Sequence, residues 1–251
     1  EGLAASLFPT QYSEHTLSDE SIDHFVGNAL HRALETLTEQ VRRGLRFSNT
    51  AVELEKAVLR ERAQEITHSL ARQLPDIRAL LVSDLLAAYQ GDPAATSVSE
   101  ILLCYPGMHA VIYHRLAHAV HRLGAPLIPR VIAEIAHWQT GIDIHPGAEI
   151  GRGFFIDHGT GVVIGAAAVI GANVRLYQAV TLGAKRFQAD ESGALVKGDA
   201  RHPIIEDDVV IYAGATILGR ITVGRGSTIG GNVWLTQSVP PGSIITQARS
   251  R

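Results

Sequence analysis

The stretch IDIHPGAEIGRGFFIDHGTGVVIGAAAVIGANVRLYQAVTLG, residues 142–183, repeats an aliphatic residue at a spacing of six. With two interruptions, this spacing continues through thirteen positions: Ile144, Ile150, Ile156, Ile164, Ile170, Leu176, Leu182, Ile205, Ile211, Ile217, Val223, Ile229 and Leu235. A period of six matches neither the 3.6-residue period of a helix nor the two-residue alternation of a strand. It is typical of a parallel β-helix, in which each group of six forms one short strand and one corner, and the repeated aliphatics stack inside.

A second series of mostly small residues lies two positions before the next aliphatic. Its members are Ala148, Ala168, Val174, Val180, Val209, Ala215, Ile221, Ser227 and Val233. Hexapeptide-repeat proteins of this kind wind to the left, so we expect a left-handed parallel β-helix over residues 141–251. With the helical pattern that precedes it, this predicts the α+β class.

The preceding residues follow the 3.6-residue period of amphipathic helices. The pattern predicts helices over residues 17–45 (capped by Ser18 or Asp19), 52–74, 76–90, 100–103, 109–123 and 129–139, with a stop at Pro75 and a break at Pro106-Gly107. Residues 1–17 carry no such pattern, and we expect them to be irregular. The chain therefore divides into an N-terminal all-helical domain, residues 1–140, and a β-helix domain, residues 141–251.

Composition excludes several classes of protein. The chain has 251 residues, 46% of them hydrophobic, a net charge of −3 and one cysteine, Cys104, which we expect in the core. No run approaches the ~18 apolar residues of a membrane span, no signal peptide opens the chain and no disulfide framework is possible. These features predict a cytoplasmic protein without a membrane partner, and the absent initiator Met suggests trimmed termini. Without a basic cluster, nucleic acid is not expected as a partner.

Histidines recur in the helical domain. His114, His118 and His121 have the spacing of metal ligands on one helix face, but neither an acidic ligand nor an HExxH motif accompanies them. We therefore expect packing or solvated histidines and no metal site.

Function tends to lie where a regular repeat is interrupted. Ile156 and Ile164 are eight residues apart, and the segment between them carries DHGTG, residues 157–161. Leu182 and Ile205 are twenty-three residues apart where six are expected, which predicts one long inserted loop over residues 184–203.

Counting three groups of six per coil places the Asp143 corner directly beneath the Asp157–Val163 corner, which carries His158, at a strand spacing of ~4.8 Å. A carboxylate in that position can orient an imidazole and stabilise its protonated form. The alternative is that Asp143 caps a turn and His158 is an ordinary loop residue. The spacing alone leaves both interpretations open.

Several motifs together resemble the serine O-acetyltransferase family of hexapeptide-repeat acyltransferases. They are DIHPGAEIGRG (143–153), DHGTGVVIG (157–165), VTLG (180–183), RHP (201–203) and YAGATILG (212–219). The long insertion and the ending GGNVWLTQSVPPG (230–242) are similar to the longer bacterial subgroup, and the resemblance continues upstream to GDPA (91–94). The combination of DHGTG and RHP is specific, because generic hexapeptide proteins lack it.

The resemblance implies an enzyme that transfers the acetyl group of acetyl-CoA to the hydroxyl of L-serine, giving O-acetyl-L-serine and CoA, the first step of cysteine biosynthesis. His158 is then the general base and Asp143 orients its ring. Asp92 and Asp157 would bind the serine ammonium, and Arg201 its carboxylate. His202 would bind substrate or stabilise the tetrahedral oxyanion.

Acetyl-CoA, the expected co-substrate, should lie in a groove between coils of neighbouring chains. Small residues must line such a groove, and the candidates are Gly183, Ala213, Gly214 and Gly231. The coil count places the insertion a strand's length from the His158 corner. Unless the loop folds back across that face, this predicts an active site shared between the chains of a trimer.

The resemblance also implies partners: a homotrimer or a dimer of trimers, and L-cysteine as a feedback inhibitor. Members of the family usually end in a tail that docks into O-acetylserine sulfhydrylase. This chain ends ITQARSR, residues 245–251, which puts that partnership in doubt.

Other functions fit the fold as well, since fold does not fix function. A γ-type carbonic anhydrase needs three zinc-bound histidines, but His145, His158 and His202 lack that family's close pair. A non-catalytic scaffold leaves the Asp143–His158 layering and the RHP motif unexplained. Among enzymes, the alternative is acetyl transfer to another small hydroxyl acceptor, such as homoserine or a sugar.

Overall fold

The computed structural model describes residues 1–13, 16–48, 55–186, 193–196 and 198–247. By their contacts the residues form two compact units, one of residues 1–79 and 115–132 and one of residues 80–114 and 133–251. The second unit holds the β-helix together with residues 80–114 and 133–140, most of which are helical. Helical structure ends at Thr140 and the first strand begins at Asp143. The assignment of separate domains at that boundary stays a prediction.

Seven helices precede the strands in the described part of the chain. They are α1 (Gly2–Leu7), α2 (Pro9–Tyr12), α3 (Asp19–Phe47), α4 (Lys56–Gly91), α5 (Val98–Cys104), α6 (Pro106–Arg122) and α7 (Ile128–Thr140). The predicted cap of the first long helix is confirmed: the Ser18 hydroxyl accepts from the Ser21 amide, and the Ser21 hydroxyl accepts from the Ser18 amide.

Three details of the helical prediction were wrong. Residues 1–17 are not irregular throughout, because α1 packs on α3 and the Arg78 guanidinium donates to the Leu7 carbonyl at 2.8 Å. Pro75 lies inside α4 instead of ending a helix. It removes one backbone donor, but Leu70, Leu74, Ile77 and Leu81 are buried on both sides of it, so packing keeps the helix continuous. Pro106 begins α6, a position where proline is tolerated because the first amide of a helix has no partner.

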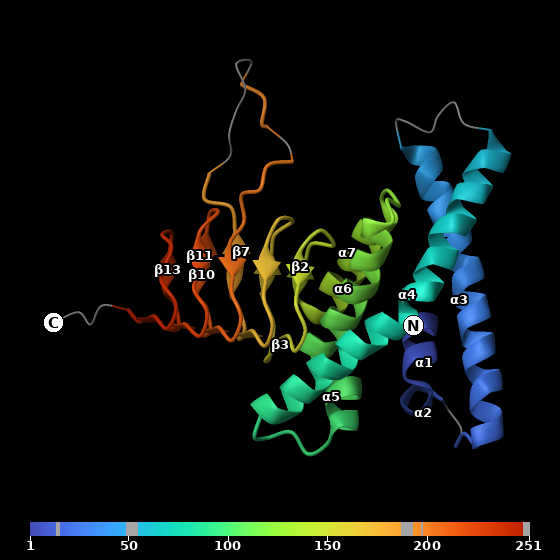
Figure 1. Cartoon of the computed structure of the whole chain (residues 1–251), viewed down its shortest axis with the longest axis horizontal. Helices are drawn as coiled ribbons and strands as arrows, with labels where there is room; N and C mark the ends of the chain where they lie inside the picture. The colour runs from blue at the N-terminus through green and yellow to red at the C-terminus, as the bar shows by residue number, and fades with distance from the viewer. Residues whose placement is uncertain (14–15, 49–54, 187–192, 197, 248–251) are drawn as a thin grey trace. The chain divides into compact units, whose positions relative to one another are not determined.

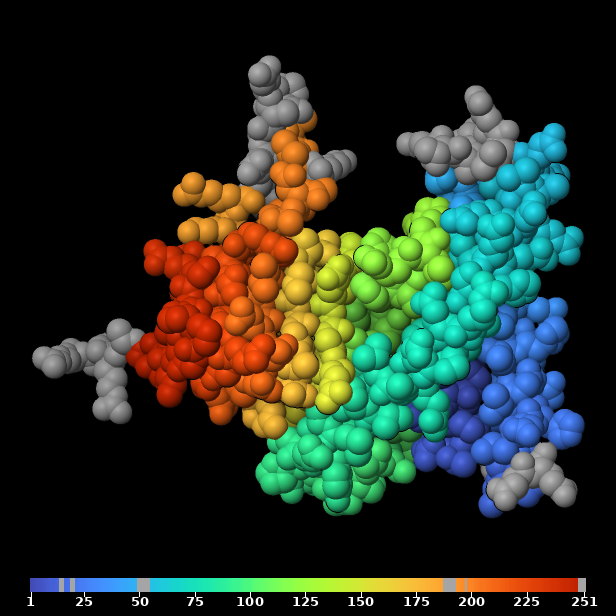
Figure 2. All heavy atoms as spheres, viewed as in Figure 1, coloured from blue at the N-terminus to red at the C-terminus, as the bar shows by residue number. Residues whose placement is uncertain are grey.

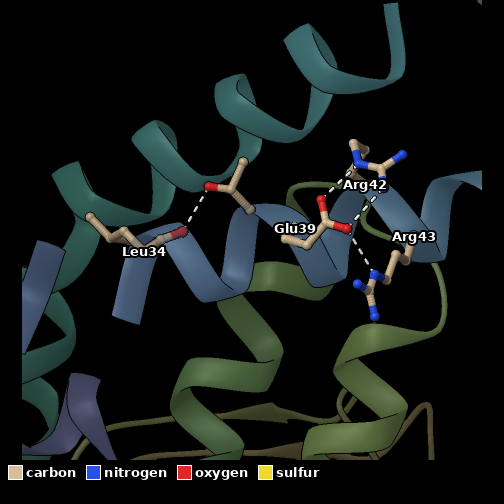
Figure 3. Close-up of polar contacts among 5 residues, drawn as sticks. Leu34, Glu39, Arg42 and Arg43 are labelled. Carbon is tan, nitrogen blue, oxygen red and sulfur yellow. Dashed lines mark hydrogen bonds and ion pairs between the residues drawn. The ribbon is translucent and has the colours of Figure 1, made fainter. Parts of the chain in front are cut away.

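The surface of α3 carries a network of ion pairs. Figure 3 shows the Glu39 carboxylate between the guanidinium groups of Arg42 and Arg43, each with an N–O distance of 2.8 Å. These charge-assisted hydrogen bonds lower the pKa of Glu39 to about 2. Glu39 therefore stays ionised at far lower pH than an isolated carboxyl group.

The strands form three parallel sheets, which are the three faces of the β-helix, and its coils follow one another from β1 to β14 (Figure 1). In the space-filling view the colour of the β-helix passes from yellow-green to red along the same direction (Figure 2). The first face contains β1 (Asp143–Ile144), β4 (Val163–Ile164), β7 (Thr181–Gly183), β10 (Thr216–Leu218) and β13 (Trp234–Leu235). The second contains β2 (Glu149–Ile150), β5 (Val169–Ile170), β8 (Ile204–Ile205) and β11 (Thr222–Val223). The third contains β3 (Phe155–Ile156), β6 (Arg175–Leu176), β9 (Val210–Ile211), β12 (Thr228–Ile229) and β14 (Ile244–Ile245).

Both series of the repeat point into the β-helix, as predicted. Twelve of the thirteen aliphatics are buried, and Ile150 on the first coil is half-buried. Every member of the second series is buried, including Ser227, whose hydroxyl bonds to the backbone of Pro240 and Ser243. The left-handed parallel β-helix and the α+β class are therefore confirmed.

Two corners of the β-helix carry the interruptions of the repeat. The His158 corner lies between the third face and the first, where residues 157–162 join β3 to β4. The insertion corner lies between the first face and the second, where residues 184–203 join β7 to β8 (Figure 1). One face of the β-helix, the first, therefore separates the two interruptions.

One further observation concerns the surface. Cys104 is exposed and not in the core, because the buried residues of α5 are Ile101 and Leu102.

Within the described residues, no helix is both long enough and apolar enough to cross a membrane.

Candidate functional site

The interruption between Ile156 and Ile164 forms a bulge at the His158 corner. Strand register pairs Ile156 with Leu176 and Ile164 with Leu182, so two residues, His158 and Gly159, have no counterpart on the next coil. Both have left-handed backbone conformations, with φ of 59° and 89°. The bulge leaves the His158 side chain 70% exposed. The two extra residues of the sequence thus produce one protruding imidazole.

The predicted layering of Asp143 and the His158 corner is confirmed. Asp143 pairs with Val163 on the next coil, and the Gly161 amide donates to the Gly141 carbonyl at 2.8 Å. No hydrogen bond or ion pair joins Asp143 to His158 within the described residues. The His158 ring instead forms an ion-pair contact with Asp157, whose Oδ1 lies 3.8 Å from His158 Nδ1. The orienting role of Asp143 stays a prediction.

Asp92 reaches the same corner from the turn that follows α4. The Tyr105 hydroxyl donates to its Oδ2 at 2.6 Å, and the Ala94 amide donates to its Oδ1 at 2.8 Å. These two bonds, with smaller effects of the His158 and Arg175 charges, lower the pKa of Asp92. The hydrogen bond to Asp92 raises the pKa of Tyr105 to about 12, and the charge of Asp157 adds to this shift. Asp92, Asp157 and His158 therefore belong to one electrostatic cluster.

Arg175 holds the end of α4 beside this cluster. Its guanidinium lies over the Phe155 ring, 5.4 Å from the centroid, and against Gly91, the last residue of α4. A Cβ at Gly91 would overlap the guanidinium, which explains the glycine of the GDPA motif. The last turn of α4 has no basic residue of its own, so Arg175 supplies the cation that stabilises a helix C-terminus. Sequence reasoning missed Tyr105 and Arg175, because their contacts with residues 91 and 92 depend on how α4 meets the third face.

The other two predicted substrate residues, Arg201 and His202, lie at the insertion corner. His202 is only 8% exposed, and its ring packs against Gly165, where a Cβ would overlap it. Its Nδ1 accepts from the Ala167 amide at 3.2 Å. Burial, then the charges of Arg201 and Arg220, lower the pKa of His202 and favour its neutral form. The chain therefore separates the predicted site residues between two corners.

Three of the four residues predicted to line the acetyl-CoA groove share a corner with His158. Ala213 and Gly214 lie between β9 and β10, and Gly231 lies between β12 and β13. A Cβ at Gly231 would lie 3.2 Å from the Ala213 carbonyl, and Gly214 has a φ of 71°, so small residues are required there. Gly183 ends β7 at the insertion corner, away from the other three.

The histidines of α6 differ in burial: His114 is buried, His118 half-buried and His121 exposed. Over the described ranges, no group of three or more His, Cys, Asp or Glu side chains is arranged to hold a metal ion. A hollow of about 550 Å³ lies along α3 and α4, and one of about 410 Å³ lies along α4 beside Leu123. No predicted site residue lines either.

The geometry defines what each corner can do. The His158 corner presents an exposed imidazole, which can act as a base, beside carboxylates that can bind a cation. The insertion corner presents a guanidinium, which can bind a carboxylate, and a buried imidazole favoured in its neutral form. Together these groups complement a zwitterion that carries a hydroxyl.

Comparison with known proteins gives matches along the whole chain. Residues 11–112 match the family described as serine acetyltransferase, N-terminal, and residues 202–237 match the bacterial transferase hexapeptide repeat. The plasmid serine acetyltransferase of Synechococcus elongatus is 61% identical over 253 aligned positions, which cover 100% of this chain and 79% of that protein.

Solved structures are similar in fold as well. Serine acetyltransferase 1 of Entamoeba histolytica in complex with L-cysteine has a TM-score of 0.85 and 39% identity, covering 98% of this chain and 85% of that one. The Neisseria gonorrhoeae enzyme in complex with serine has a TM-score of 0.64 and 27% identity, covering 100% and 95%. The Brucella abortus enzyme in complex with coenzyme A has a TM-score of 0.66 and 28% identity, covering 100% and 92%.

Proposed function

This chain belongs to the serine acetyltransferase family, and on that basis we propose that it transfers the acetyl group of acetyl-CoA to the hydroxyl of L-serine. The products are O-acetyl-L-serine and CoA, and the reaction is the first step of cysteine biosynthesis. The observation that carries the proposal is the 61% identity along the whole chain to a serine acetyltransferase. Relatives of the same fold have been solved with serine and with coenzyme A bound.

His158 is the proposed general base. A serine hydroxyl is a weak nucleophile at neutral pH, and an imidazole that removes its proton accelerates attack by about 10²–10⁴-fold. The oxygen attacks the thioester carbonyl, the tetrahedral intermediate collapses with cleavage of the C–S bond, and the CoA thiolate takes the proton from the imidazolium. The exposed bulge supports this role because the ring is free to approach a substrate. Asp143, one layer below this corner, is proposed to orient the ring.

The charges of the site complement the serine zwitterion. Asp92 and Asp157 are proposed to bind the ammonium, and the lowered pKa of Asp92 keeps that carboxylate ionised. Arg201 is proposed to bind the carboxylate through two parallel hydrogen bonds. His202, favoured in its neutral form, is proposed to donate a hydrogen bond to the substrate or to the oxyanion.

We propose that a site built from both corners is shared between chains. His158 and His202 lie at corners separated by one face, and a cyclic trimer can bring the His158 corner of one chain against the insertion corner of its neighbour. Acetyl-CoA is then proposed to lie between neighbouring β-helices, along Ala213, Gly214 and Gly231. A homotrimer, or a dimer of trimers, is accordingly the proposed assembly.

We also propose an inhibitor and a cellular location for this enzyme. L-cysteine is the proposed feedback inhibitor, supported by the Entamoeba histolytica complex with L-cysteine. A cytoplasmic location suits an enzyme whose co-substrate is acetyl-CoA. Binding to O-acetylserine sulfhydrylase is tested by adding that enzyme to the purified protein.

The experiment is a thiol-release assay with acetyl-CoA and a panel of acceptors: L-serine, L-homoserine and a sugar. We expect serine to have the highest kcat/KM, and mass spectrometry to identify O-acetyl-L-serine. A higher kcat/KM for homoserine or the sugar would overturn the acceptor assignment. Release of CoA at the same rate without any acceptor would overturn the assignment of the protein as an acetyltransferase.

A further inference from the structure

The end of the insertion is sandwiched between two coils. The Val169 amide donates to the Pro203 carbonyl at 3.1 Å on one side, and the Ile204 amide donates to the Ile221 carbonyl at 2.8 Å on the other. Arg220 lies between β10 and β11, on the coil that follows the insertion. Its side chain reaches back across the insertion to the coil on the opposite side.

Arg220 makes two hydrogen bonds there. Its Nη1 donates to the Ala167 carbonyl at 2.6 Å and to the His202 carbonyl at 3.0 Å. Ala167 is also the residue whose amide donates to His202 Nδ1. One guanidinium therefore joins the two residues whose mutual contact fixes the His202 imidazole.

That contact determines where the ring proton lies. A backbone amide can only donate, so Nδ1 of His202 must be the unprotonated nitrogen, and the proton of the neutral ring is on Nε2. The same ring packs against Gly165. The charged groups that face it, Arg201 and Arg220, act with burial against protonation. His202 is thus held as a neutral donor in one orientation.

We propose that Arg220 is a positioning residue. Its hydrogen bonds tie the end of the insertion, at His202, to the neighbouring coil, at Ala167, and so hold the His202 ring with Nδ1 as acceptor and Nε2 as donor. The inference rests on the proposed role of His202 in binding the acceptor or its oxyanion. Because Arg220 acts through His202, its removal should matter only while His202 is present.

The first measurement compares Arg220→Ala, Arg220→Lys and Arg225→Ala with the unaltered enzyme. Arg225 is the matched control, an exposed arginine of the same coil whose guanidinium lies 3.3 Å from Asp207. We expect Arg220→Ala to lower kcat/KM for serine on the order of tenfold, because small misplacements of a catalytic group slow reactions strongly. KM for acetyl-CoA should be unchanged, Arg220→Lys should recover part of the loss, and Arg225→Ala should have no effect.

The second measurement is NMR of ¹⁵N-labelled histidine, with the His202 signal assigned by its disappearance in His202→Ala. We expect a single Nε2-protonated tautomer in the unaltered enzyme and a mixture in Arg220→Ala, a change that a general loss of stability does not produce. An unchanged tautomer together with unchanged kcat/KM would overturn the proposal.

A double-mutant cycle separates this inference from the proposed function. In the His202→Ala background, Arg220→Ala should cause no further loss of kcat/KM. If Arg220→Ala lowered kcat/KM as much in this background as in the unaltered enzyme, Arg220 would not act through His202. That result would overturn this inference and leave the proposed function standing. If His202→Ala is itself fully active, the proposed role of His202 is wrong, while the tautomer signal still decides whether Arg220 holds the ring.

Discussion

Tyr105→Phe isolates one contact of the acceptor site. The change removes a hydroxyl and leaves the ring, so Asp92 Oδ2 loses the 2.6 Å hydrogen bond while Oδ1 keeps the Ala94 amide. Asp92 then has one restraint where it had two, and its pKa rises from its lowered position toward the ordinary value.

The size of the effect follows from the geometry. A hydrogen bond to a charged group contributes ~1.5–3 kcal/mol when buried, and partial exposure of both partners reduces this to ~1 kcal/mol. That corresponds to about a fivefold rise in KM for serine. Asp92 binds an ammonium only when ionised, and its lowered pKa keeps it ionised as pH falls. The variant should therefore lose serine affinity at a higher pH than the unaltered enzyme.

The assay is thiol release at varied serine and fixed acetyl-CoA, from pH 3.5 to pH 8, a range that reaches below the ordinary Asp pKa of 3.8. KM for acetyl-CoA should not change, since Tyr105 contacts Asp92, which is proposed to bind serine and not acetyl-CoA. Tyr89→Phe is the matched control, because Tyr89 is an exposed tyrosine of α4 that forms no hydrogen bond with another described residue through its hydroxyl. An unchanged KM for serine, or a rise confined to acetyl-CoA, would refute the reasoning.

Three more expectations concern assembly and stability. Mixed trimers of His158→Ala and His202→Ala chains, each impaired on its own, should recover activity on co-expression. Mixed trimers that form and show no recovery would place each site within one chain. Ser227→Ala should lower the free energy of unfolding in urea by ~1 kcal/mol, because the Pro240 carbonyl and the Ser243 amide lose their hydrogen bonds to the buried serine hydroxyl; an unchanged midpoint would contradict this. Glu39→Gln should be less stable than the unaltered chain at pH 7, and the difference should vanish as pH falls from about 4.5 to about 2, since the folded state depresses the pKa of Glu39. A difference independent of pH would refute that origin.

The β-helix could be predicted from sequence because its repeat is local. A six-residue period places each aliphatic directly above the last, so the register of Ile144 with Ile164 can be obtained by counting. The same counting located the bulge at His158 and the separation of the insertion from it. Pro75 shows the limit: its local preference is to end a helix, and only tertiary packing of α4 decides otherwise.

Contacts between elements could not be predicted. Tyr105 reaches Asp92, and Arg175 reaches Gly91, because α4, α5 and the third face meet in space, and no spacing encodes that meeting. Arg220 meets His202 only because the insertion returns between two coils. The sequence indicated which residues carry charge and hydroxyls, while the fold determines which of them hold others in place.

The most direct test is the turnover of His158→Ala with acetyl-CoA and L-serine. We expect kcat to fall by on the order of 10²–10⁴-fold, because the hydroxyl loses its base. KM for acetyl-CoA and the midpoint of thermal unfolding should stay near those of the unaltered enzyme, because His158 lies exposed on a bulge. A folded His158→Ala enzyme that retains near-full turnover would contradict general-base catalysis at this corner.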